Sequence, residues 1–265
     1  MKKAIALGIL LATGGAAHGY MGEIVASYPC PEGRNAYALT VGDRYLYAYI
    51  TGLFRVYRIE RWTGSVVNSY APAVGGTVAG MAFEEGPYLW MHDQGFAPVW
   101  FHRCNEETGS IYSSIPIITQ GCASVDFETP RGEPAPIRSI LMSVSIGIYG
   151  QHLLRFTTAG SFIDSFKPEI TPWSEIAWDY GNGWLWLPRD DYHPYYHAYD
   201  THGSLVASFP PITAAHIPRG LDYYGEYLWV SSQTLSDPHI LIIHCPVRYP
   251  AVTPASVGRI KALYR

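Results

Sequence analysis

Several polar and aromatic side chains stand just outside apolar runs of this sequence, where a folded chain would present them to solvent. They are His92, Asp93, Trp173, Arg189, Asp190, Asp191 and His193. Aromatic rings offer flat apolar faces for stacking, and carboxylates accept hydrogen bonds from hydroxyl groups. This combination predicts a shallow pocket for a carbohydrate or a peptide. The competing interpretation is that these residues lie in turns and bond to nearby backbone.

Two of these carboxylates are also candidates for hydrolysis. Glycosidases hold two carboxyl groups about 5 to 10 Å apart across the scissile bond, and Asp93 and Asp190 could form such a pair. Neither lies in a recognisable catalytic motif. The sequence has no Gly-x-Ser-x-Gly elbow, His-Glu-x-x-His helix or phosphate-binding loop. We therefore expect a binding protein, with a polysaccharide-active hydrolase as the alternative.

We predict neither a metal site nor a cofactor. His193 and His197 are four residues apart, but Pro194 interrupts the segment, so the two rings do not share a helix face. A calcium ion held by Asp190 and Asp191 is a weaker alternative.

The four cysteines leave the disulfide pattern open. They allow three pairings, and buried thiols or an intermolecular bridge are the alternatives. The residues are Cys30, Cys104, Cys122 and Cys245.

The first residues predict export. Lys2 and Lys3 precede a short apolar run, and Ala17 and Gly19 have the small side chains of a cleavage site. The run is too short to span a bilayer, and no cysteine follows it that would carry a lipid. We expect residues 1–19 to be a signal peptide and residues 20–265 to form one secreted or periplasmic domain without membrane insertion.

Composition favours strands and argues against one class of partner. The chain has 21 Tyr, 8 Trp, 26 Gly and 20 Pro, which suit short strands joined by turns. Its net charge is −4 and its Lys and Arg residues are scattered, so nucleic acid is not an expected partner.

One short pattern recurs at intervals of about 45 residues, for example as Gly64-Ser-Val-Val-Asn-Ser-Tyr70. A glycine turn followed by β-branched and aromatic residues predicts a strand. The copies begin at Gly22, Gly64, Gly109, Gly160 and Gly203, and a weaker copy spans Gly258–Tyr264. A period of this length predicts a solenoid, a propeller or an array.

Further strand signals lie between successive copies. Met81-Ala-Phe83, Tyr88-Leu-Trp90 and the run from Val99 to Cys104 show their order in one repeat. In the third repeat a Pro-rich connection from Thr129 to Pro136 replaces the short turn. Four short antiparallel strands per repeat predict an all-β propeller, with strands a to c inside and the glycine strand, d, outermost.

This order resembles the secreted repeat proteins of the YVTN and NHL kind, in which a Gly-x-Val segment precedes Gly-Leu-Ala-like and Leu-Trp-Val-like strands. The resemblance covers residues 22–265. It implies that the b-to-c and d-to-a loops share one face around a central channel, so the candidate ligand-binding residues would meet there. It is nearly silent on activity, because propellers carry many unrelated functions.

Five sets of inner strands predict five four-stranded blades, with six blades as the alternative. One terminal copy, Gly22–Tyr28 or Gly258–Tyr264, closes the ring, and the other is spare. A spare strand is a template for pairing with another chain. We expect an exported, non-enzymatic binding or assembly module whose carbohydrate or protein ligand is unknown. A structural subunit of an extracellular assembly, joined through the spare strand, is a further alternative.

Overall fold

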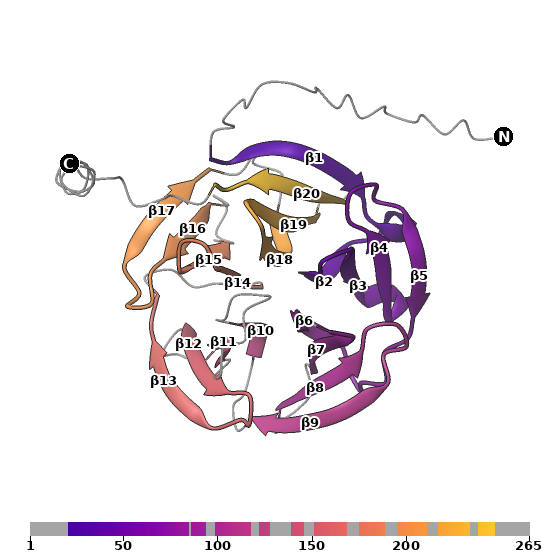
Figure 1. Cartoon of the computed structure of the whole chain (residues 1–265), viewed down its shortest axis with the longest axis horizontal. Coiled ribbons are helices and arrows are strands. Elements are labelled where there is room, and N and C mark those ends of the chain that lie inside the picture. Colours follow the sequence, from indigo (N-terminus) through magenta and orange to yellow (C-terminus); the bar gives the residue numbers. More distant parts are fainter. Residues whose placement is uncertain are drawn as a thin grey trace, which may run out of the picture.

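The computed structural model describes residues 21–84, 86–93, 99–117, 122–127, 139–145, 151–168, 175–188, 195–210, 217–233 and 238–246. The described strands form five four-stranded antiparallel sheets. These sheets stand radially around one axis, as the blades of a propeller do (Figure 1). The predicted all-β propeller fold is therefore confirmed.

The first four blades are continuous in sequence and run from the axis outwards. Blade 1 comprises β2 (Ala36–Val41), β3 (Tyr45–Ile50), β4 (Arg55–Glu60) and β5 (Val66–Tyr70). Blade 2 comprises β6 (Val78–Glu84), β7 (Tyr88–Asp93), β8 (Val99–Asn105) and β9 (Ile111–Ile117). Blade 3 comprises β10 (Cys122–Phe127), β11 (Ser139–Ser145), β12 (Gln151–Thr157) and β13 (Phe162–Phe166). Blade 4 comprises β14 (Ala177–Asp179), β15 (Trp184–Pro188), β16 (Tyr196–Tyr199) and β17 (Leu205–Phe209).

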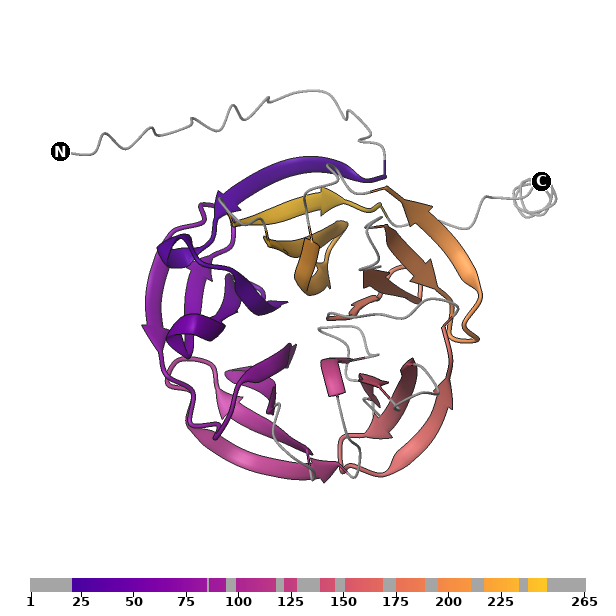
Figure 2. The same ribbon diagram turned by 180° about the vertical axis from the view of Figure 1, so that it is seen from behind.

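Blade 5 joins the two ends of the described chain. Its inner strands are β18 (Ile217–Tyr224), β19 (Tyr227–Gln233) and β20 (His239–His244), and β1 (Glu23–Pro29) supplies the outer one. β1 runs antiparallel to β20, on the rim of the ring (Figures 1 and 2). Of the two candidates for closing the ring, the N-terminal copy therefore does so. The copy at Gly258–Tyr264 lies outside the described residues.

The repeated glycines explain the motif, because each one meets a side chain from the preceding blade. Gly64 has a φ of 70°, and a Cβ there would lie 2.6 Å from the ring of Tyr28 in β1. Glycine is the residue that tolerates both this backbone and this contact. Each further copy repeats the contact: Gly109 with Tyr70, Gly160 with Ile115, Gly203 with Phe166, and Gly22 with Phe209. The contacts therefore join the rim into a closed ring.

The apolar core lies between adjacent blades rather than in one central cluster. Tyr47 and Val56 of blade 1 pack with Met81, Leu89 and Cys104 of blade 2. Blades 4 and 5 share a second such cluster. The helices among the described residues are the short 3-10 turns η1 (Pro31–Gly33) and η2 (Thr51–Leu53). No helix in this part of the chain is long and apolar enough to cross a membrane.

Candidate functional site

A buried carboxylate lies where the innermost strands meet. Glu175 lies two residues before the short inner strand of blade 4 and is 1% exposed. It accepts backbone N–H hydrogen bonds from Leu39 at 2.8 Å, Met81 at 2.9 Å and Leu221 at 2.9 Å. These three donors occupy equivalent positions on β2, β6 and β18, each just after a break in strand register. Burial raises the pKa of Glu175 well above its ordinary value, and the three donors offset part of this effect.

Other inner side chains link blades 5, 1 and 2. Asp222 in β18 accepts hydrogen bonds from the Thr40 hydroxyl at 2.8 Å and the Val41 N–H at 2.5 Å. The Thr40 hydroxyl oxygen in turn accepts the N–H of Phe83 at 2.9 Å. These bonds and those of Glu175 use the polar atoms of the axis to hold blades together. We therefore assign the axial carboxylates a structural role, in which they hold neighbouring blades together, rather than a role in ligand binding.

Asp93 is the last residue of β7, where the b-to-c connection begins. Its carboxylate lies against the d-to-a connection, because a Cβ on Gly76 would come within 2.1 Å of Oδ1. This Oδ1 is buried and accepts no hydrogen bond within the described part of the chain. Asp93 is thus at the meeting point of the two kinds of loop expected to form the binding face.

Tyr49 approaches Asp93 from blade 1. Its side chain is 1% exposed, and its hydroxyl donates to no acceptor among the described residues. Burial raises the pKa of Tyr49, the Val78 N–H lowers it, and the charge of Asp93 raises it. A buried hydroxyl without an acceptor costs free energy. A ligand group that accepted this bond would recover that cost.

His102 and Trp100 in β8 complete this cluster. His102 Nδ1 lies 2.8 Å from the Ser114 hydroxyl oxygen. Burial lowers the pKa of His102, and the charge of Asp93 raises it in part. The Trp100 ring stacks on His102 with centroids 6.4 Å apart and an interplanar angle of 17°, yet stays 37% exposed. We call Tyr49, Asp93, Trp100 and His102 the Asp93 site.

Within the described part of the chain, the Asp93 site combines a hydroxyl that donates no hydrogen bond, a carboxylate oxygen that accepts none, and an aromatic plane. A hydroxyl group can accept the Tyr49 hydrogen bond and donate to Asp93 at the same time. A carboxylate or phosphate group would be repelled by Asp93, and an ammonium group cannot accept from Tyr49. Trp100 adds a face on which the apolar side of a sugar ring can stack. The chemistry of the site therefore suits a neutral ligand group that both accepts and donates a hydrogen bond, such as a sugar hydroxyl.

His92 does not present its ring at the binding face, contrary to the expectation from sequence. It is 0% exposed and packs on Phe101, with ring centroids 5.4 Å apart. Neither ring nitrogen makes a hydrogen bond within the described residues. Burial lowers the pKa of His92 to about 3, with a smaller contribution from His102. The reason is strand alternation, since His92 and Asp93 are neighbours in β7 and point to opposite sides of the sheet.

The other predicted ligand-binding residues cannot be placed. Trp173, Arg189, Asp190, Asp191 and His193 lie outside the described residues. The structure therefore brings Asp93 together with side chains that sequence reasoning missed. The signal that could have found two of them is Trp100-Phe-His102, where an aromatic residue and a histidine share one face of a strand.

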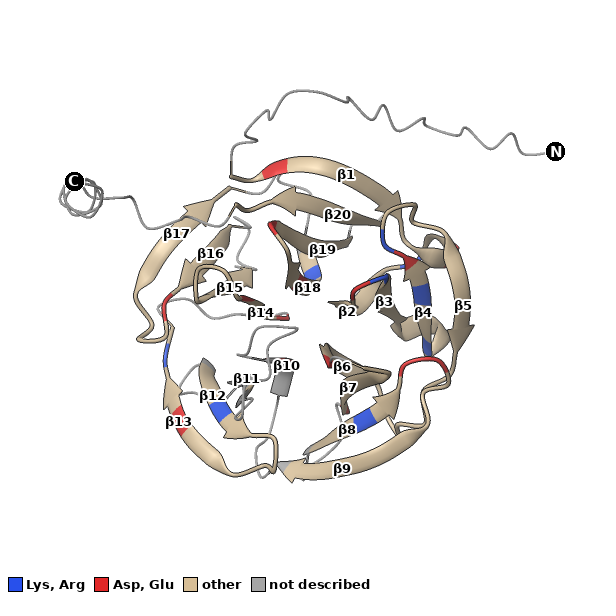
Figure 3. Ribbon diagram, in the orientation of Figure 1, with Lys and Arg blue, Asp and Glu red and all other residues tan. Residues whose placement is uncertain are grey.

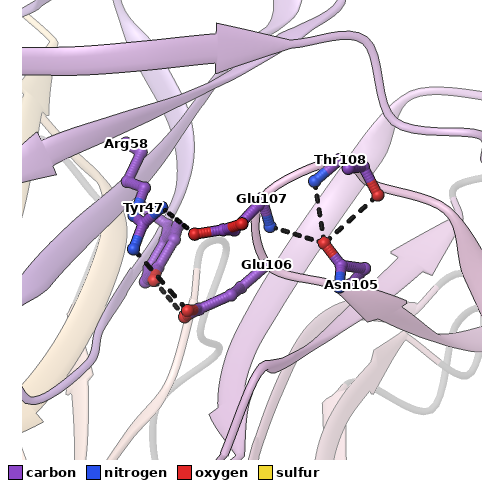
Figure 4. Close-up of polar contacts among 6 residues, drawn as sticks. All are labelled: Tyr47, Arg58, Asn105, Glu106, Glu107 and Thr108. Carbon is purple, nitrogen blue, oxygen red and sulfur yellow. Dashed lines mark hydrogen bonds and ion pairs between the residues drawn. The ribbon is translucent and has the colours of Figure 1, made fainter.

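A polar cluster joins β3 and β4 of blade 1 to the turn between β8 and β9 of blade 2 (Figure 4). Arg58 in β4 donates to Glu107 at 2.7 Å, and its other terminal nitrogen lies 3.7 Å from Glu106. Tyr47 in β3 donates its hydroxyl to Glu106. The Asn105 side chain accepts the backbone N–H of Glu107 and so fixes the turn. Arg58 of blade 1 is thus paired with two glutamates of blade 2, and we assign this cluster a structural role.

Three predicted disulfide candidates are buried thiols, namely Cys30, Cys104 and Cys245. Burial raises the pKa of Cys104 to about 12 and also raises that of Cys245. The side chain of Cys122 lies outside the described part. No group of three His, Cys, Asp or Glu side chains among the described residues is arranged to hold a metal ion. Charged residues occur in all five described sheets (Figure 3).

Solved structures share the fold of this chain. One is the glutaminyl cyclase of Myxococcus xanthus, with a TM-score of 0.62 and 10% identity over 86% of this chain and 97% of that chain. Another comes from the nidogen/laminin complex, with a TM-score of 0.50 and 10% identity over 74% of this chain and 72% of that chain. No family model and no curated protein sequence matches the chain. These likenesses show the fold alone.

Proposed function

We propose that this chain is an exported, non-enzymatic binding module that holds a neutral carbohydrate at the Asp93 site. One observation carries the proposal. Among the described residues, Asp93 Oδ1 accepts no hydrogen bond and the Tyr49 hydroxyl donates none, while Trp100, on the strand next to that of Asp93, is 37% exposed. In native proteins such buried orphan groups are few, and each one calls for an explanation. A sugar hydroxyl would satisfy both groups.

The hydrolase alternative has less support. The carboxylates on the axis, Glu175 and Asp222, already accept several hydrogen bonds from the protein. Asp93 has no second carboxylate in the described part of its cluster, and Asp190 lies outside that part. A glycosidase needs two carboxyl groups at a set separation. We therefore favour binding over hydrolysis.

An array of immobilised neutral and charged glycans, probed with residues 20–265, tests the proposal. Asp93→Asn and Trp100→Ala should each lower binding of neutral glycans at least tenfold, since each removes one element of the site. Trp62→Ala is the matched control, because Trp62 is an exposed tryptophan (54%) in the c-to-d turn at the other end of the strand. Binding that is unchanged in both site variants, or lost equally in the control, would refute the site. Release of sugar by the wild-type protein would favour the hydrolase.

A second candidate function, self-association, follows from how the ring closes. We infer five blades, and the outer position of each is filled by β5, β9, β13, β17 or β1. The sixth copy of the motif, Gly258–Tyr264, lies outside the described residues, which already fill all five positions. We propose that this copy pairs with another molecule. Light scattering of the protein with and without residues 247–265 tests this, and a monomer in both cases would refute it.

A further inference from the structure

Blade 4 repeats the aromatic and histidine pair of the Asp93 site. Tyr195 stacks on His197 with centroids 5.9 Å apart and an interplanar angle of 27°. Tyr195 is 38% exposed and His197 is 9% exposed. The corresponding values in blade 2 are 37% for Trp100 and 9% for His102. The two pairs thus share ring chemistry, burial and stacking geometry.

The two pairs also hold the same position in their blades. Phe101, between Trp100 and His102, lies opposite Ile115 of the outer strand. Tyr196, between Tyr195 and His197, lies opposite Phe209 of the outer strand. Ile115 and Phe209 each contact the motif glycine of the next copy, so they are equivalent. Both pairs therefore begin the third strand of a blade, directly after the b-to-c connection.

The repeat itself does not require this pair. The equivalent positions carry Arg55 and Tyr57 in blade 1, His152 and Leu154 in blade 3, and His239 and Leu241 in blade 5. None of these combines an aromatic residue with a histidine two residues later. The pair in blades 2 and 4 is thus a feature of two blades rather than of the fold.

We propose that Tyr195 and His197 form a second sugar platform, so that one ring binds two units of a neutral polysaccharide. This inference rests on the proposed function and adds that one molecule has two ligand-binding sites. Both platforms follow b-to-c connections, which share one face of a propeller, and blade 3 separates them in chain order. A flexible polymer that reached both would bind the second by an intramolecular step. Such linkage strengthens apparent binding on the order of 10² fold or more without any new contact.

Titration calorimetry with the neutral oligosaccharide that gives the strongest array signal measures the number of sites. We expect two sites in the wild type, one in Trp100→Ala, one in Tyr195→Ala and none in the double variant. On densely printed glycan spots, each single variant should lose on the order of 10² fold in apparent affinity. Tyr195→Phe keeps the aromatic plane and should retain two sites, which separates loss of the platform from loss of folding.

The outcomes distinguish this inference from the proposed function. One site in the wild type that is lost in Trp100→Ala and unaffected by Tyr195→Ala would overturn the second platform and leave the Asp93 site standing. One site that is lost only in Tyr195→Ala would overturn the two-site model and the Asp93 site together. An array without any bound neutral glycan would overturn both at the start.

Discussion

Replacing Glu175 by alanine tests how the ring is held at its axis. The substitution leaves the N–H groups of Leu39, Met81 and Leu221 buried without an acceptor. Each orphaned donor costs about 1 to 3 kcal/mol. The carboxyl group's own desolvation cost disappears with it, and water can enter the space, so the net loss should lie near the lower bound, about 3 kcal/mol. For a domain of this size that corresponds to a fall in Tm of about 6 to 12 °C.

Urea unfolding followed by tryptophan fluorescence measures this loss. Asp164→Ala is the matched control, because Asp164 is a half-exposed carboxylate paired with Arg155 at 3.4 Å. A surface pair of this kind contributes at most about 1 kcal/mol. If Glu175→Ala cost no more than the control, the axial hydrogen bonds would not fasten the blades and the reasoning would be refuted.

Three further predictions follow from burial and backbone geometry. Because the pKa of Glu175 is raised above 4.5, the folded state keeps a proton that the unfolded chain releases. The stability of the wild type relative to Glu175→Gln should therefore fall as pH rises above 4.5. Urea unfolding measures both proteins, and the same pH dependence in the two would contradict this prediction. The pKa of His92 is lowered from 6.5 to about 3, so the unfolded chain binds a proton there that the folded state does not. Between pH 7 and pH 4.5 the free energy of unfolding of the wild type should therefore fall by about 2 to 3 kcal/mol more than that of His92→Leu. The same titration checks this prediction, and an equal loss in the variant would disprove it. Gly64→Ala should lower the free energy of unfolding by about 1 to 3 kcal/mol more than Gly183→Ala. Both glycines have positive φ, but only at Gly64 would the added Cβ lie 2.6 Å from a side chain, the ring of Tyr28. Equal melting temperatures of the two variants would show that the Tyr28 ring can move aside without cost.

The repeat made the fold readable from sequence. Each described copy of the glycine motif has a local signal, which is the glycine turn followed by two β-branched, aliphatic or aromatic residues. Each also makes a long-range contact, that of Gly64 with Tyr28 or its equivalent. Periodicity reveals the first kind of signal directly. Periodicity did not identify the strand that closes the ring, because both Gly22–Tyr28 and the weaker copy Gly258–Tyr264 carry the motif. Pairing of β1 with β20 decides that choice, and pairing partners are not encoded locally.

The candidate site was predicted only in part, for a physical reason. Asp93 could be found because it ends a recognisable strand, but Tyr49 comes from the neighbouring blade. That two inner strands bring these residues together depends on how blades pack, which a single repeat does not show. His92 illustrates the converse, since one step along β7 turns a side chain from the binding face into the core.

The most direct test of the account is a crystal structure of residues 20–265 with the neutral oligosaccharide selected by the glycan array. We expect a sugar ring stacked on Trp100, with one hydroxyl group within hydrogen-bond distance of both Asp93 Oδ1 and the Tyr49 hydroxyl. A ligand bound at the axis, or at the opposite face near Trp62, would contradict it.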